Sequence, residues 1–133
     1  MDYRKTDPQF MERFEHFAFD EVVNEPGQQL EPPTRYLAIL ATLIGCQGVE
    51  AYEEILPKAL AEGLSPIAVK ETVYQAVDYL GMGRMWPFLK ATNEIFAKRA
   101  IALPLPGQAT TTLTDRLEKG AKAQADIFGE RMK

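Results

Sequence analysis

Five stretches of the chain carry the apolar spacing of amphipathic helices, and none shows the sustained alternation of a β-strand. The connections between them are short, which is typical of helices that pack antiparallel to their neighbours. The pattern therefore predicts an all-α protein built as a compact antiparallel helical bundle. We expect its helices over residues 8–22, 34–45, 49–62, 66–80 and 85–102.

Capping residues and prolines mark where these helices begin and bend. Thr34 is expected to cap the second helix, and Ser65 followed by Pro66 is a strong start signal for the fourth. Pro57 lies inside the third helix, where we expect a kink or a break because proline removes a backbone hydrogen bond. Pro87 fits the first turn of the fifth helix.

The C-terminal part of the chain differs from the rest. Residues 104–112 are rich in proline, glycine and threonine and are predicted to be a linker between a helical domain, 1–103, and a more polar helix, 113–133. In that helix, residues 115–118 (Asp-Arg-Leu-Glu) echo residues 12–15 (Glu-Arg-Phe-Glu). The echo is either chance or the opening of a second copy of the same unit.

Charge and residue counts exclude several classes of function. Fifteen basic against nineteen acidic residues give a net charge of −4 without a basic block, so we expect no binding to nucleic acid or to a membrane surface. The longest apolar run, residues 36–46, is about half of a membrane span, and a cytoplasmic protein is expected. One cysteine and one histidine allow no intrachain disulfide and no His-rich metal site, so we predict no metal or cofactor.

Three blocks of sequence, in order, carry a family resemblance. They are residues 34–41 (Thr-Arg-Tyr-Leu-Ala-Ile-Leu-Ala), residues 59–66 (Ala-Leu-Ala-Glu-Gly-Leu-Ser-Pro), and residues 69–74 (Val-Lys-Glu-Thr-Val-Tyr) with the later Tyr79-Leu80-Gly81. Together they resemble the carboxymuconolactone decarboxylase-like family, which includes alkylhydroperoxidase D, over roughly residues 10 to 100. The tail from Asp115 to Gly120 resembles the opening helix of that family.

The resemblance implies a bundle of the alkylhydroperoxidase D-like type that oligomerises through its helices, commonly as trimers or hexamers. A homo-oligomer is therefore expected, with a small pocket where the third block meets neighbouring helices. The peroxidase branch of the family carries Cys-x-x-Cys-x-x-x-His, but the matching positions here are Gly48, Ala51 and Ile55. Peroxide reduction needs a thiolate and a group that resolves the sulfenic acid, and these three residues provide neither.

Four residues remain as candidate site residues. Glu71 matches the glutamate of the family and is either a general base or part of a solvated polar face. Arg35 matches its arginine and either pairs with a carboxylate such as Glu71 or holds the carboxylate of a substrate. Tyr79 is expected near both. Cys46 lies in an apolar run and is either a buried small side chain or a one-cysteine nucleophile.

Glu54, beside the vacated Ile55 position, forms an acidic cluster with Glu50 and Glu53 that is typical of a solvated face. A substitute acid at Glu54 is the sharper hypothesis, although adjacent helical residues point about 100° apart.

Three functions stay open. The first is chemistry on a small organic acid or lactone with Glu71 as acid or base, and the second is peroxidase activity through Cys46. The third is a catalytically inactive oligomeric scaffold.

Overall fold

The computed structural model describes residues 2–129, which form helices joined by turns and loops and contain no strand. The all-α prediction is thereby confirmed. The chain divides into two units, residues 1–103 and residues 104–133, and each is described by itself.

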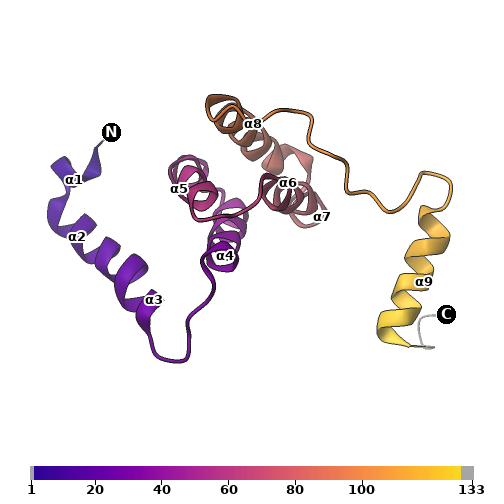
Figure 1. Cartoon of the computed structure of the whole chain (residues 1–133), viewed down its shortest axis with the longest axis horizontal. Coiled ribbons are helices and arrows are strands. Elements are labelled where there is room, and N and C mark those ends of the chain that lie inside the picture. The colour runs from indigo at the N-terminus through magenta and orange to yellow at the C-terminus, as the bar shows by residue number, and fades with distance from the viewer. Residues whose placement is uncertain (1, 130–133) are drawn as a thin grey trace. The chain divides into compact units, whose positions relative to one another are not determined.

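The first unit contains the N-terminal segment and the helices that make up the core (Figure 1). Its N-terminal segment consists of α1 (Tyr3–Thr6), α2 (Pro8–His16), the π-helical turn η1 (Phe17–Glu21) and α3 (Val22–Asn24). After a loop come α4 (Pro32–Gly45), α5 (Val49–Ala61), α6 (Pro66–Gln75), α7 (Val77–Leu80) and α8 (Met82–Lys98).

The hydrophobic core lies between α4, α5, α6 and α8. Tyr52 of α5 and Phe88 of α8 are fully buried and meet edge to face, with ring centroids 5.2 Å apart. The hydroxyl group of Thr92 donates to the carbonyl oxygen of Phe88 at 2.7 Å, so the Tyr52 hydroxyl donates to Thr92, also at 2.7 Å. Every polar atom of this cluster therefore has a partner inside the core.

Several predicted helix boundaries are wrong, and the prolines explain most of the differences. Helix α4 begins at Pro32, so Thr34 lies in its first turn rather than capping it. Helix α5 continues through Pro57, and α8 begins at Met82, which places Pro87 beyond its first turn. The residues four positions before these internal prolines, Glu53 and Gly83, are exposed.

Two other predicted helices are divided or shortened. The helix expected over residues 66–80 is interrupted at Ala76 between α6 and α7, and the last predicted helix of the first unit ends at Lys98. The helix expected over residues 8–22 contains the π-helical turn η1, which periodicity does not predict. Ser65 caps α6 as expected, because its Oγ accepts a hydrogen bond from the backbone N–H of Ala68 at 3.1 Å.

The second unit contains α9 (Arg116–Phe128). Four large apolar residues of the unit are exposed: Leu113, Leu117, Ile127 and Phe128. Among residues 2–129, no helix combines the length and the apolar character that a membrane crossing requires.

The buried hydroxyl of Tyr52 makes stability depend on pH at the alkaline end. Burial raises the pKa of Tyr52 from its ordinary value of 10.0 to about 12. Between these two values the unfolded chain loses the Tyr52 proton while the folded chain keeps it, so the free energy of unfolding falls as pH rises. We expect a fall of about 1.4 kcal/mol per pH unit from this group.

Urea unfolding at pH 9, 10 and 11 measures this fall. The Tyr52→Phe variant is the matched control, because it keeps the ring and lacks the ionisable proton. Its stability should decline less steeply than that of the parent over the same pH values. Equal slopes for the two proteins would contradict the prediction.

Candidate functional site

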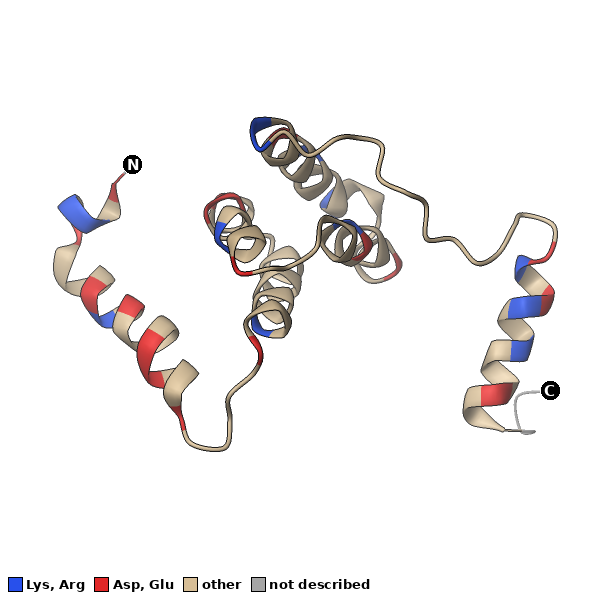
Figure 2. Cartoon of the chain, viewed as in Figure 1, with Lys and Arg blue, Asp and Glu red and all other residues tan. Residues whose placement is uncertain are grey.

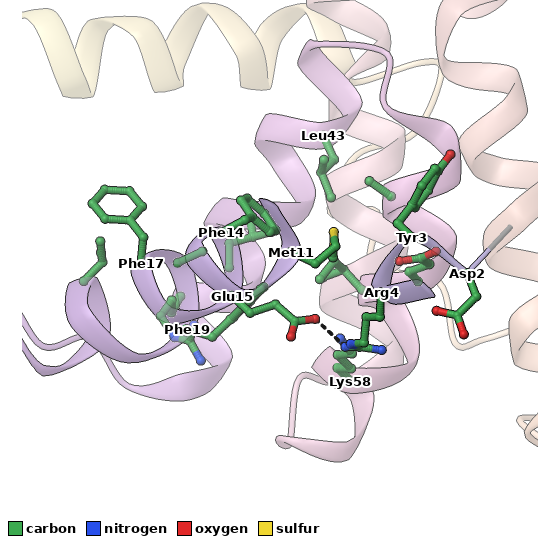
Figure 3. Close-up of a pocket in the computed structure, with 17 residues that line it drawn as sticks. Asp2, Tyr3, Arg4, Met11, Phe14, Glu15, Phe17, Phe19, Leu43 and Lys58 are labelled. Atoms are coloured by element: carbon green, nitrogen blue, oxygen red, sulfur yellow. Dashed lines mark hydrogen bonds and ion pairs between the residues drawn. The ribbon is translucent and has the colours of Figure 1, made fainter. Parts of the chain in front are cut away.

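A cavity of about 470 Å³ lies between the N-terminal segment and the helix pair α4–α5. We call it the N-terminal pocket (Figure 3). A volume of this size is within the usual range for sites that bind small molecules. Its lining comprises Asp2, Tyr3, Arg4, Met11, Phe14, Glu15, Phe17, Ala18, Phe19, Val22, Arg35, Ile39, Leu43, Ala51, Glu54, Ile55 and Lys58.

Helical periodicity places the α4 and α5 side chains on this wall. Arg35, Ile39 and Leu43 follow one another at intervals of four residues, so they share the face of α4 that borders the pocket. The residues next to them in sequence, such as Tyr36 and Leu40, point into the core instead. Arg35 is the only charged residue of α4, and the rest of this helix is drawn in tan in Figure 2.

The opposite wall is aromatic and comes from the N-terminal segment. Phe14 and Phe17 are about half exposed, and no residue of α1, α2, η1 or α3 is buried. Arg4 and Glu15 form an ion pair on this wall, drawn as a dashed line in Figure 3. The hydrogen bond to Glu15 raises the pKa of Arg4 above its usual value.

Among the described residues, Arg35 has a buried side-chain nitrogen that lacks a hydrogen-bond partner. Its Nη1 is buried and has no hydrogen-bond partner, while the guanidinium lies over the Tyr36 ring at 4.8 Å from the centroid. Within the described residues it forms no ion pair with Glu71 or with another carboxylate. A buried donor without a partner costs about 1–3 kcal/mol.

The remaining charged groups of the pocket differ in whether they are already paired. Asp2 pairs with Lys5 at 3.5 Å, and Glu15 pairs with Arg4. Glu54 and Lys58 have no ion pair within residues 2–129, although the Lys58 ammonium lies 5.6 Å from the centroid of the Phe19 ring. Arg35, Glu54 and Lys58 are therefore the charged groups of the pocket that can still take a partner.

The four predicted site residues do not converge on one pocket. Arg35 lines the N-terminal pocket, whereas Tyr79 is 88% exposed and borders a second cavity of about 380 Å³ along α4, α6 and α7. Glu71, on α6, is partly exposed and is not among the residues that line either cavity. Cys46 is exposed, and its thiol donates to the carbonyl oxygen of Leu43 at 3.6 Å.

The positions that the family resemblance marks as vacated are part of the pocket. Ala51 and Ile55, which stand where the peroxidase branch has its second cysteine and its histidine, both line the pocket. Gly48, at the position of the first cysteine, is the N-cap of α5. Glu54 borders the same pocket as Ile55, although adjacent helical residues point about 100° apart. Within the described residues, no group of acidic, histidine and cysteine side chains is arranged to hold a metal ion.

These features define an all-helical protein with a largely apolar pocket and an unpaired guanidinium in its wall. The model of the carboxymuconolactone decarboxylase family matches residues 8–94, which run from α2 into α8 and include most of the pocket. The chain belongs to the carboxymuconolactone decarboxylase family. No curated protein and no solved structure matches it.

Proposed function

We propose that the protein binds an organic acid or a lactone acid in the N-terminal pocket, with the carboxylate of the ligand held by Arg35. The observation that carries this proposal is the buried, unpartnered Nη1 of Arg35 at the wall of an apolar cavity. A guanidinium and a carboxylate form charge-assisted hydrogen bonds, which are among the stronger polar contacts in proteins. The apolar residues around Arg35 would cover the rest of the ligand.

We further propose Glu54 as the group that takes or returns a proton in any reaction of the bound acid. Glu54 lines the pocket together with Arg35 and is the carboxylate there without an ion pair in the described chain. The acid–base role expected for Glu71 has less support, because Glu71 does not line this pocket. Peroxidase chemistry at Cys46 and assembly into a homo-oligomer stay predictions.

Matched variants of the two glutamates test the assignment. We expect Glu54→Gln to slow turnover of muconolactone, followed by ultraviolet absorbance, by about 100-fold, because general acid–base groups contribute about that much. Glu71→Gln is the control and should turn over at the rate of the parent. A loss confined to Glu71→Gln would return the role to Glu71. No turnover by the parent protein would contradict the acid–base proposal and favour a purely binding or scaffold role.

A further inference from the structure

The α4–α5 wall of the N-terminal pocket has two distinct ends, because the two helices run antiparallel. At one end, a Cβ built on Gly48 would lie 3.2 Å from the side chain of Leu43. At the other end, a Cβ built on Gly63 would lie 3.9 Å from Pro33. The start of α5 is thus beside the end of α4, and the end of α5 is beside the start of α4 (Figure 1).

This arrangement places both cations of the wall toward one of its ends. Arg35 is near the start of α4 and Lys58 near the end of α5, so both cations lie toward the same end. Leu43 and Ala51 lie toward the other end and carry no polar side-chain atom. Ile39, Ile55 and the carboxylate of Glu54 line the stretch between them. The wall therefore has a cationic end and an apolar end.

The distance between the two ends sets the length of a matching ligand. Arg35 and Leu43 are eight residues apart on α4, which corresponds to about 12 Å along the helix axis at about 1.5 Å per residue. An extended acyl chain of about eight to ten carbons has this length. A lactone acid is shorter and would contact the cationic end alone.

From this polarity and length, we infer that the pocket takes a linear monocarboxylic acid of medium chain length, with its carboxylate at Arg35 and its methyl end at Leu43 and Ala51. The inference rests on the proposed function, which places the carboxylate at Arg35. The aromatic wall formed by Phe14 and Phe17 would cover the acyl chain from the opposite side (Figure 3). Arg35 and Lys58 can form charge-assisted contacts with the carboxylate of an acid, and a neutral lipid offers no such group.

Binding of a series of fatty acids to the full chain tests the inference. Isothermal titration calorimetry would compare butanoate, hexanoate, octanoate, decanoate and dodecanoate below their micellar concentrations. Each added methylene group buried on the apolar wall should tighten the Kd about threefold to fourfold up to decanoate. Dodecanoate should bind no more than about twofold more tightly than decanoate, because its last carbons extend past Leu43 into solvent.

A variant that fills the apolar end provides a second, independent readout. In the parent, the Kd should stop tightening with chain length at decanoate; we call this chain length the plateau. Ala51→Phe should move the plateau to a shorter acid. The Kd of butanoate should stay unchanged, because butanoate does not reach that end. Ala61→Phe, at an exposed position of α5 that does not line the pocket, is the matched control. Circular dichroism of both variants shows whether α5 is retained, and a folded Ala51→Phe with an unmoved plateau would overturn the inference.

The same titrations distinguish a wrong chain length from a wrong carboxylate site at Arg35. If affinity does not change with chain length, or muconolactone binds more tightly than decanoate, the medium-chain assignment is wrong. Binding of those acids that is lost in Arg35→Met would still uphold the proposed function. If 1-decanol binds as tightly as decanoate, the carboxylate is not recognised and both proposals fail. Absence of binding by every acid in the series overturns both.

Discussion

Replacement of Arg35 by methionine is expected to weaken the binding of octanoate about 30-fold without lowering the stability of the protein. Methionine has a similar length and fills the same space, so the variant loses the charge and the hydrogen-bond donors but keeps most of the packing. A hydrogen bond to a charged group contributes about 1.5–3 kcal/mol, which corresponds to about 10-fold to 100-fold in affinity. Calorimetric titration of the two proteins measures the change.

The stability of the same variant separates a binding role from a structural one. Since Nη1 of Arg35 is buried without a partner, its removal eliminates a desolvation cost while giving up the contact with the Tyr36 ring. We expect the free energy of unfolding to stay the same or to rise by about 1 kcal/mol. Arg84→Met, on an exposed part of α8, should change neither quantity. A marked loss of stability in Arg35→Met would show that the guanidinium serves the fold.

The second large effect is expected at the centre of the core. Phe88 is fully buried and packs edge to face against Tyr52, so Phe88→Ala removes a large apolar side chain and leaves a cavity. We expect the free energy of unfolding to fall by about 4 kcal/mol, a large share of the stability of an ordinary domain. Urea unfolding followed by circular dichroism measures this difference.

Phe10→Ala is the matched control for this prediction. Phe10 lies on α2 with 68% of its surface exposed and does not line the N-terminal pocket. Its truncation should change the free energy of unfolding by less than about 0.5 kcal/mol, as is usual for exposed positions. Similar losses for Phe10→Ala and Phe88→Ala would mean that α2 contributes to the core as much as α8 does.

Periodicity predicted the core helices well because their apolar positions are determined by local spacing. The stretch 34–45 with Leu37, Leu40 and Ile44 is helical because the buried side of α4 repeats at helical intervals. The helix boundaries were less predictable, since they depend on backbone groups. Pro57 lies inside α5 without ending it, although proline removes a backbone hydrogen bond, and the sequence pattern does not predict that continuation.

The sequence allows the α4 wall of the candidate site to be predicted, but not the aromatic wall. Arg35 was singled out from its motif, and the run of Arg35, Ile39 and Leu43 at intervals of four was visible in the sequence. The aromatic wall depends on how the N-terminal segment folds back through the loop after α3, which local propensities do not determine. Glu54 and Ile55 both line the pocket although adjacent helical residues point about 100° apart, which periodicity along α5 alone does not predict.

The absence of buried residues in the N-terminal segment has a consequence for the kinetics of ligand exchange. A segment with few buried contacts opens locally at a low free-energy cost, whereas Tyr52 and Phe88 are released only by global unfolding. Backbone amides of α2 should therefore exchange their hydrogens far sooner than those of α5 and α8. An acid bound as proposed would then enter and leave the N-terminal pocket through this partial opening, on a timescale set by the segment and independent of the lifetime of the folded core.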